Sequence, residues 1–224
     1  KNSTVDTSEF VSTKAQELTD KQKYQVLENL GIITDEIYGT NGIIDLRNSI
    51  AGTAGTSLTV HMQLRTINPN NNISDVAKTA TSGRILELFN TTSHTKGSVE
   101  LRVVNNSNTL RFYTDNNTHE DKSLDLGTAA STMVVSFSSS MNSDFSNYAA
   151  CAKRSDSSSE TTFWTKHGVT SPALSFDKVF LSEGLVLRIT VENNKLYNWD
   201  DSFKNKVKEL AEEFYLAPGE IAPH

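Results

Sequence analysis

The side chains best suited to nucleophilic or acid–base chemistry are five histidines, which are spread along the whole chain. They are His61, His94, His119, His167 and His224. None stands beside a Gly-x-Ser-x-Gly turn, the arrangement that presents a nucleophilic serine to a histidine base. His61 falls in an alternating run, where we expect it on the solvated face of a strand. These spacings do not predict a catalytic triad.

Residues 115–121, Asp-Asn-Asn-Thr-His-Glu-Asp, form the densest group of oxygen ligands in the sequence. A calcium ion takes about six to eight oxygens around one point. The segment has neither the spacing of a recognised calcium loop nor a glycine at its turn. We expect a solvated hairpin loop there, with calcium binding as the alternative and no other cofactor. Residues 50–56 contain two glycines but lack the lysine and the following helix of a phosphate-binding loop.

Aromatic side chains are the remaining candidates for ligand binding, because a ring joins a large apolar face to a polar edge. Trp164, Tyr148 and Tyr113 are the residues that we assign to stacking on sugar rings, with packing in the core or at an interface as the alternative. A glycosidase requires two carboxylates about 5 to 10 Å apart. Scattered acidic residues such as Glu87, Glu100 and Glu183 cannot be placed relative to one another from the sequence, so they do not support such a pair. We therefore predict a protein that is not an enzyme.

Length and composition favour one main domain with smaller attachments, since the chain has 224 residues of which 36% are hydrophobic. A net charge of -6 gives no general attraction to nucleic acid or to anionic lipid. The longest apolar run is far shorter than the roughly 20 residues that cross a bilayer, so we expect no membrane insertion. Cys151 is the single cysteine, which excludes an internal disulfide and a cysteine-based zinc cluster.

Three consecutive runs, at 84–89, 98–104 and 109–114, alternate between apolar and charged residues with a period of two. This period is typical of strands with one buried and one solvated face. Asparagine-rich and glycine-containing connections join the runs, which indicates an antiparallel meander. On its solvated face we expect Glu87, Glu100, Arg102 and Arg111 to lie opposite one another. Charges dispersed merely for solubility are the alternative.

Further short runs, separated by polar turns, follow the same pattern without helical spacers between them. They span residues 56–67, 132–138, 161–164, 174–181 and 185–192. Short strands in such succession favour two packed antiparallel sheets. The predicted fold class is mainly β, an antiparallel jelly-roll-like β-sandwich with a short N-terminal neck helix and a C-terminal helix.

Two helices are predicted outside the sandwich. In residues 18–32, Thr19 and Gln22 form a capping box and Gly31 ends the helix. Its narrow apolar side consists of Val26, Leu27 and Leu30, and Ile32, which follows Gly31, can fold back on Leu27. This side needs a partner because so short a helix is marginal alone. Copies of the same chain or the β-domain are the two candidates for that partner. Residues 200–214 form the second helix, capped by Asp200, Asp201 or Ser202.

The chain therefore divides into four parts along its length. They are an extended arm at 1–15, the neck helix and linker at 16–42, the β-sandwich at 43–200, and the C-terminal helix and tail at 201–224.

Residues 18–32, Leu-Thr-Asp-Lys-Gln-Lys-Tyr-Gln-Val-Leu-Glu-Asn-Leu-Gly-Ile, resemble a short linker of bacteriophage fibre and other virion appendage proteins. The shared pattern is Leu-Thr-x-x-Gln-Lys followed by Asn-Leu-Gly. In that family the linker precedes a β-rich head and is commonly part of a trimeric stalk. The strand pattern of residues 56–192 also resembles concanavalin-like (laminin-G-like) sandwiches, which often bind glycans, although no metal-binding or sugar-binding signature of that family is present.

These resemblances imply a structural virion protein of fibre type, located on the extracellular particle. Its N-terminal part would attach to other virion proteins or form a homotrimer through the four apolar neck residues named above. Its sandwich would be displayed for contact with a host surface or a glycan receptor. The alternative hypotheses are a carbohydrate-binding module of a cell-surface protein and a glycoside-active enzyme.

Overall fold

The chain divides into two units, Lys1–Thr34 and Asp35–His224, and only the second is described by the computed structural model. The described residues are 36–52, 55–73, 75–76, 83–90, 98–104, 107–113, 119–124, 130–140, 146–155, 160–168, 174–198 and 200–215. For residues 103–104, 107–108, 110–113, 119–124, 130, 146–155 and 160–168 the description covers the backbone alone. The predicted neck helix, with Val26, Leu27, Leu30 and Ile32, lies outside the described residues.

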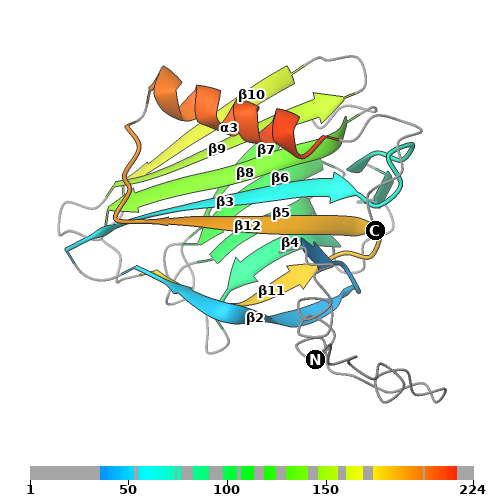
Figure 1. Cartoon of the computed structure of the whole chain (residues 1–224), viewed down its shortest axis with the longest axis horizontal. Helices are drawn as coiled ribbons and strands as arrows, with labels where there is room; N and C mark the ends of the chain where they lie inside the picture. Colours follow the sequence, from blue (N-terminus) through cyan, green and yellow to red (C-terminus); the bar gives the residue numbers. More distant parts are fainter. Residues whose placement is uncertain are drawn as a thin grey trace, which may run out of the picture. The chain divides into compact units, whose positions relative to one another are not determined.

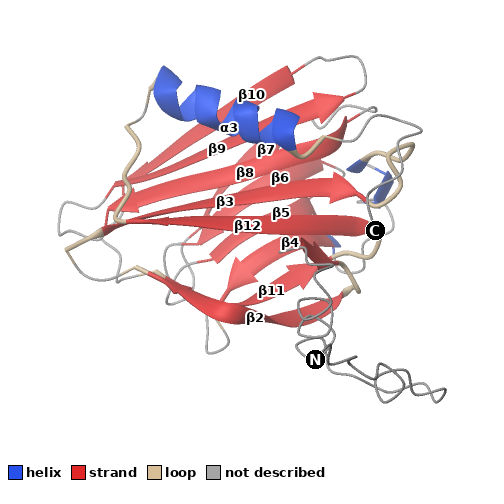
Figure 2. Ribbon diagram, in the orientation of Figure 1, coloured by secondary structure: helices blue, strands red, loops and turns tan. Residues whose placement is uncertain are grey.

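The described strands build two antiparallel sheets, with the helix α3 on the outside of one of them (Figures 1 and 2). The elements are β1 (Glu36–Tyr38), β2 (Gly42–Ala51), β3 (Ser57–Thr66), β4 (Arg84–Phe89), β5 (Ser98–Val104), β6 (Ser107–Tyr113), β7 (His119–Leu124), β8 (Ala130–Ser140), β9 (Ser146–Ser155), β10 (Glu160–Gly168), β11 (Ser175–Leu181), β12 (Leu185–Asn193) and α3 (Asp201–Glu213). Sheet A has the order β1-β12-β3-β8-β9-β10, and sheet B has the order β2-β11-β4-β5-β6-β7. The predicted mainly β sandwich is confirmed.

Alternation along each strand separates the core from the outer faces. In β3, Leu58, Val60 and Met62 pack into a core that both sheets share. The rings of Phe137 in β8 and Phe176 in β11 meet edge to face, with centroids 5.7 Å apart, and so join the two sheets directly. Burial of this apolar surface between the sheets is the main stabilising term of the sandwich.

The helix α3 confirms the C-terminal prediction. Asp200 is its N-cap, and its side chain accepts hydrogen bonds from the backbone N–H groups of Ser202 and Phe203, at 2.9 and 3.4 Å. The apolar side of the helix packs on the outer face of sheet A around Val134. That side consists of Phe203, Val207, Leu210, Ala211 and Phe214, all of them buried. No helix among the residues that the structure describes is long and apolar enough to span a membrane.

The β2 edge of sheet B is irregular. Asp45 pairs with Lys178 of β11 and Ile50 pairs with Phe176, so residues 46–49 stand opposite the single residue Asp177. Extra residues on one strand of a pair form a bulge, which bends and twists that strand. At the edge of sheet A, β1 is only three residues long and pairs with β12.

Candidate functional site

The outer face of sheet B carries charged side chains in direct register. Glu87 of β4 lies opposite Glu100 of β5, and Glu100 lies opposite Arg111 of β6. Arg84 lies opposite Arg102 on the same two strands, β4 and β5. The prediction that the charges of the meander face one another across the strands is confirmed. We call the surface made by Arg84, Glu87, Ser98, Glu100 and Arg102 the arginine–glutamate face.

Arginine side chains neutralise both carboxylates of this face. The Arg84 Nε lies 3.0 Å from Glu87 Oε2 and 4.0 Å from Glu100 Oε1. The Arg102 Nη1 lies 3.5 Å from Glu100 Oε2. The Ser98 hydroxyl donates a hydrogen bond of 2.9 Å to Glu87 Oε1. Two carboxylates placed directly opposite repel each other, and these partners offset that repulsion.

The burial of this face differs from the solvated surface that alternation alone predicts. Glu87 and Glu100 are only 2% and 4% exposed. The side chains of Arg84 and Arg102 remain 30% and 26% exposed. A molecule that approaches from water therefore meets guanidinium groups, while the carboxylates that hold them lie below the accessible surface.

Aromatic rings fix the position of one of these guanidinium groups. The Arg84 guanidinium carbon lies 4.8 Å from the centre of the Phe180 ring and 5.7 Å from that of Phe89. Cations attract the electron-rich face of a ring at such distances. Phe180 in turn lies opposite Ile43 of β2, whose side chain is 57% exposed. An exposed apolar side chain therefore borders the arginine–glutamate face.

A bulge brings Arg84 to this face. Residues three apart in a regular strand point to opposite sides of the sheet, yet Arg84 contacts Glu87. The register shifts between Arg84 and Leu86, and Ile85 is fully buried. This irregularity places Arg84 beside the two glutamates. Sequence reasoning missed Arg84 because strict alternation assigns it to the other face.

A second polar cluster lies on the outer face of sheet A, around His61. The His61 Nδ1 is 2.8 Å from the Ser136 hydroxyl, and its Nε2 is 2.7 Å from Glu192 Oε2. The Tyr197 hydroxyl donates to the same Glu192 oxygen at 2.9 Å. His61 is 1% exposed, so the expectation of a solvated histidine was wrong. The Tyr197 ring meets the imidazole edge to face, and the same ring stacks on Phe203 of α3.

Burial governs the protonation of this cluster. It lowers the pKa of His61, and the neighbouring Glu192 opposes that shift only in part. For Glu192, burial alone would raise the pKa, but hydrogen bonds from His61 and Tyr197 outweigh it and lower the pKa. Burial and the Glu192 carboxylate raise the pKa of Tyr197 to about 12. Ser136, His61 and Glu192 follow the order nucleophile, base and acid, but Ser136 is fully buried and offers no access to a substrate.

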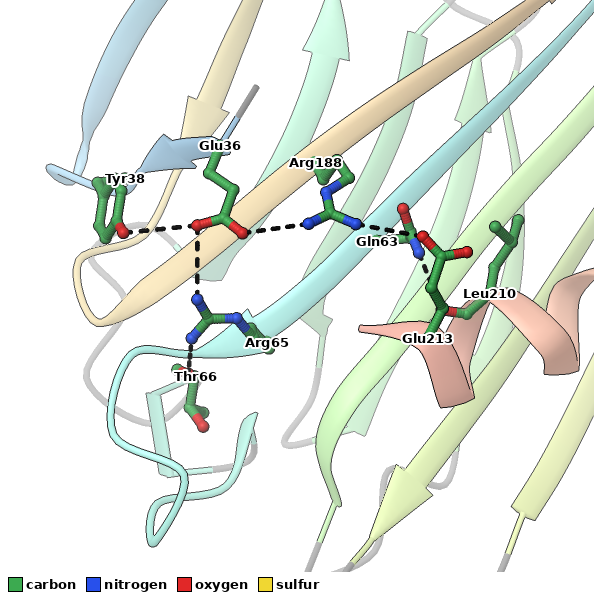
Figure 3. A network of polar contacts seen from close by, with 8 residues as sticks. All are labelled: Glu36, Tyr38, Gln63, Arg65, Thr66, Arg188, Leu210 and Glu213. Atoms are coloured by element: carbon green, nitrogen blue, oxygen red, sulfur yellow. Dashed lines mark hydrogen bonds and ion pairs between the residues drawn. The ribbon is translucent and has the colours of Figure 1, made fainter. Parts of the chain in front are cut away.

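A third network fastens the end of α3 to sheet A (Figure 3). Glu36 bridges the guanidinium groups of Arg65 and Arg188, at 3.5 and 3.4 Å. Arg188 also pairs with Glu213 at 3.3 Å, and both arginines lie within 5.2 Å of the Phe214 ring centre. Cations at a helix C-terminus are favoured by the helix dipole. These contacts join β1 and the C-terminal end of α3 to the strands β3 and β12 of sheet A.

The three aromatic candidates fall in different sheets. Tyr113 is in β6, where it pairs with Ser98 of the arginine–glutamate face. Tyr148 and Trp164 are in β9 and β10 of sheet A, where Tyr148 pairs with Ser138 and Lys166, and Trp164 pairs with Ala150. The side chains of all three lie outside the described part of the structure. Their backbone positions show that the three residues do not share one sheet, and that Tyr113 alone adjoins the charged face.

The predicted calcium segment is described in part. Residues 119–121 begin the strand β7 instead of continuing a loop, and residues 115–118 lie outside the described residues. Within the described residues no three histidine, cysteine, aspartate or glutamate side chains are grouped so that they could hold a metal ion.

No family model matches the chain, and no curated protein matches its sequence. Among solved structures, a bifunctional GH43-CE protein of Bacteroides eggerthii is similar over 75% of this chain and 22% of its own, with 11% identity and a TM-score of 0.38. The structure titled HCR/D-Sa-GBL1/C matches 69% of this chain and 36% of its own, with 9% identity and a TM-score of 0.34. A toad ovary galectin in complex with thio-digalactose matches 64% of this chain and 98% of its own, with 14% identity and a TM-score of 0.30. These scores are too low to carry an argument, so the fold rests on the strand topology itself.

Proposed function

We propose that this chain is a non-enzymatic adhesion module of a virion appendage, and that it binds carbohydrate through the arginine–glutamate face. The observation that supports the binding surface best is the pair of partly exposed arginines, Arg84 and Arg102, held by buried glutamates. A sugar presents hydroxyl groups that accept hydrogen bonds and a C–H face that is apolar. The face offers guanidinium N–H donors for the hydroxyl groups, and the exposed side chain of Ile43 at its border offers an apolar contact for the C–H face.

Preorganisation makes this surface suited to binding. A free arginine side chain loses rotamer entropy when a ligand orders it, which weakens binding. Arg84 is already fixed by Glu87 on one side and by Phe180 on the other. The cost of ordering it therefore falls on folding rather than on binding. Tyr113, next to Ser98 in register, is the aromatic residue that we assign to this surface.

The virion role rests on the likeness of residues 18–32 to the fibre linker. In this proposal Val26, Leu27, Leu30 and Ile32 join three chains, the N-terminal part contacts other virion proteins, and the sandwich contacts a glycan on the host surface. Three weak sites on one trimer raise the overall affinity by about 10² to 10⁴ over a single site. A shallow charged face is thus adequate for attachment.

The binding part of the proposal is tested on a glycan array with the full chain, with and without calcium. We expect bound glycans, and we expect the signal to fall when Glu87→Gln releases Arg84. The variant Lys204→Gln, which changes a charge on α3 outside the arginine–glutamate face, is the control and should bind as the parent chain does. An array without any hit in either condition would overturn the proposed glycan binding.

The oligomer is tested by sedimentation of the full chain against a chain that starts at Asp35. This start retains β1, whose Glu36 joins Arg65 and Arg188. We expect a trimer from the full chain and a folded monomer from the shorter one. A monomeric full chain would argue against the appendage and favour the alternative, a carbohydrate-binding module of a cell-surface protein.

A further inference from the structure

We infer that the outer edge of β12 at residues 189–193 binds an extended segment of another polypeptide, which adds to sheet A as a strand in line with β1. This surface is separate from the arginine–glutamate face, and the inference does not depend on the proposed function. It follows from three features of the edge: the direction of its backbone groups, the regular course of the strand, and the partly buried core side chains beside it.

Hydrogen bonds at the two ends of β12 fix the direction of its backbone groups. On the β1 side, the Gly39 N–H donates to Leu185 O at 2.9 Å. On the β3 side, the Asn194 N–H donates to Ser57 O at 2.9 Å. Successive residues of a strand direct their N–H and C=O groups to opposite neighbours. The odd-numbered residues of β12 therefore face the β1 edge, and the even-numbered residues face β3.

Part of the β1 edge has no strand beside it. The strand β1 pairs only with residues 186–188, and no described strand lies against the same edge at residues 189–193. The backbone N–H and C=O groups of Ile189, Val191 and Asn193 thus point away from β3 without a hydrogen-bond partner among the described residues. Another strand is the structure whose donors and acceptors match such a row in spacing.

The strand is regular along this stretch. It pairs with β3 from end to end without a shift of register. Natural proteins usually protect an edge with a bulge, a proline or a lysine. Residues 189–193, Ile-Thr-Val-Glu-Asn, contain neither proline nor lysine, and the one charged side chain, Glu192, is already bonded to His61 and Tyr197. This edge therefore differs from the edge of sheet B, where β2 is interrupted by a shift of register.

Side chains on the inner face define the sequence pattern of the partner. Ile189 and Val191 are partly buried and pack against the core between the sheets, as do Ile37 of β1 and Leu46 of β2. Residues that lie opposite each other on paired strands share one face of the sheet. The added strand would thus place alternate side chains over the margin of the core, where β-branched apolar residues fit. The side chains between them would lie beside Thr190 on the exposed outer face.

A second copy of this chain does not fit the same edge in full. Two antiparallel stretches of residues 189–193 overlap completely only when Val191 lies opposite its own counterpart. That register would place Asn194 of the second copy opposite Arg188, where Glu36 of β1 already pairs. The edge therefore suits a short extended segment of a different polypeptide, which ends or turns away before it reaches β1.

The experiment compares two peptides on the full chain by titration of the backbone amide NMR signals. The probe is acetyl-Lys-Val-Thr-Val-Thr-Val-Lys-amide, whose valines alternate as the inner face requires and whose lysines keep it soluble. The control peptide carries an N-methyl group on the central valine. We expect the control to bind about tenfold more weakly, because the methyl group removes a hydrogen bond and keeps the two backbones apart.

A variant of the chain assigns the binding to this edge. Val191→Pro removes an N–H group that points outward, and it leaves the bonds to β3 in place because those come from Thr190 and Glu192. It should bind the probe about tenfold more weakly than the parent chain. Val191→Thr keeps both the backbone donor and the branched shape of the side chain, so it is the matched control and should bind as the parent chain does.

Hydrogen exchange gives a second measurement that needs no variant and decides the matter if Val191→Pro does not fold. In the full chain alone, the amides of Ile189, Val191 and Asn193 should exchange faster than those of Thr190 and Glu192, and the probe should slow them selectively. Equal binding of the two peptides, or no binding of the probe, would overturn the inference. Slow exchange of the odd-numbered amides without any peptide would also overturn it, since the chain or a second copy would then already cover the edge.

Discussion

The Nε2 atom of His61 lies 2.7 Å from Glu192 Oε2, so a buried imidazole donates to a carboxylate that Tyr197 also contacts. The Nδ1 atom then accepts from the Ser136 hydroxyl, which requires a neutral ring with its proton on Nε2. Because burial lowers the pKa of His61 in spite of Glu192, this neutral form is the one that the fold selects. The arrangement couples the packing of α3 to pH.

We predict that the protein loses stability as the pH falls below about 6.5, the ordinary pKa of histidine. The folded state keeps His61 neutral, whereas the unfolded chain takes up a proton there, so protonation favours unfolding. Glu192 adds a second loss at lower pH, as the solution passes below its ordinary pKa and through its lowered folded pKa. Urea unfolding of the parent chain and of His61→Gln at pH 8 and pH 5.5 measures the effect. The variant should show a smaller drop between the two pH values, and an identical drop would contradict the assignment.

We predict that Asp200→Ala destabilises the protein by about 1 kcal/mol, the usual effect of losing an N-cap. The Asp200 side chain satisfies two N–H groups that the first turn of α3 leaves unpaired. Asp201→Ala is the control. Asp201 lies in the first turn of α3, where the helix dipole favours its negative charge, and it pairs with Lys204 at the surface. Its replacement should therefore cost less, about 0.5 kcal/mol. Thermal unfolding of both variants decides the point, and equal losses would show that the cap is not the cause.

We predict that Gly39→Ala prevents normal folding or destabilises the protein by more than about 3 kcal/mol, beyond the usual range for overpacking. A Cβ atom at Gly39 would lie 1.8 Å from the backbone oxygen of Ser182, which cannot move aside as a side chain can. Gly42→Ala is the matched control, since its Cβ would meet only the Thr40 hydroxyl at 3.2 Å. Comparison of soluble yield and of the urea midpoint tests this. A Gly39→Ala protein as stable as the Gly42→Ala protein would show that the chain adjusts at this turn.

We predict that Glu87→Gln destabilises the protein more than Glu100→Gln, by about 1 to 2 kcal/mol, after allowance for the partial exposure of the arginines. Glu87 lies 3.0 Å from Arg84 and accepts from Ser98 at 2.9 Å, whereas Glu100 lies 3.5 Å from Arg102 and 4.0 Å from Arg84. Either substitution also removes the repulsion between the two carboxylates, so that repulsion cancels when the two variants are compared. Chemical unfolding of both variants measures it, and the reverse order would refute this account of the face.

Alternation was sufficient to predict the cross-strand pairing of Glu87, Glu100 and Arg111, because a period of two specifies which side chains share a face. It did not predict Arg84, since the bulge before Leu86 leaves no mark in the sequence pattern. It placed His61 on the correct face but not beneath α3, because coverage by a distant helix is a tertiary effect.

Several strands were missing from the prediction for physical reasons. The sequence of β9 contains Ala149, Ala150 and Ala152, which are weak strand formers without an apolar alternation. The strand β7, His-Glu-Asp-Lys-Ser-Leu, is almost entirely polar and is held by pairing with β6. The residues of β1 are too few for a period to appear. In each case the partner strand supplies the order that the local sequence does not.

The interruption of β2 opposite Asp177 also influences how copies of the molecule behave when they are crowded. Arg47, Asn48 and Ser49 are exposed on the protruding part of that strand. A strand arriving from another molecule would meet a kinked rim bearing a charge instead of a straight row of free amide groups. This edge of sheet B is thus a poor template for the addition of strands from other molecules. Such an edge favours colloidal stability at high local concentration.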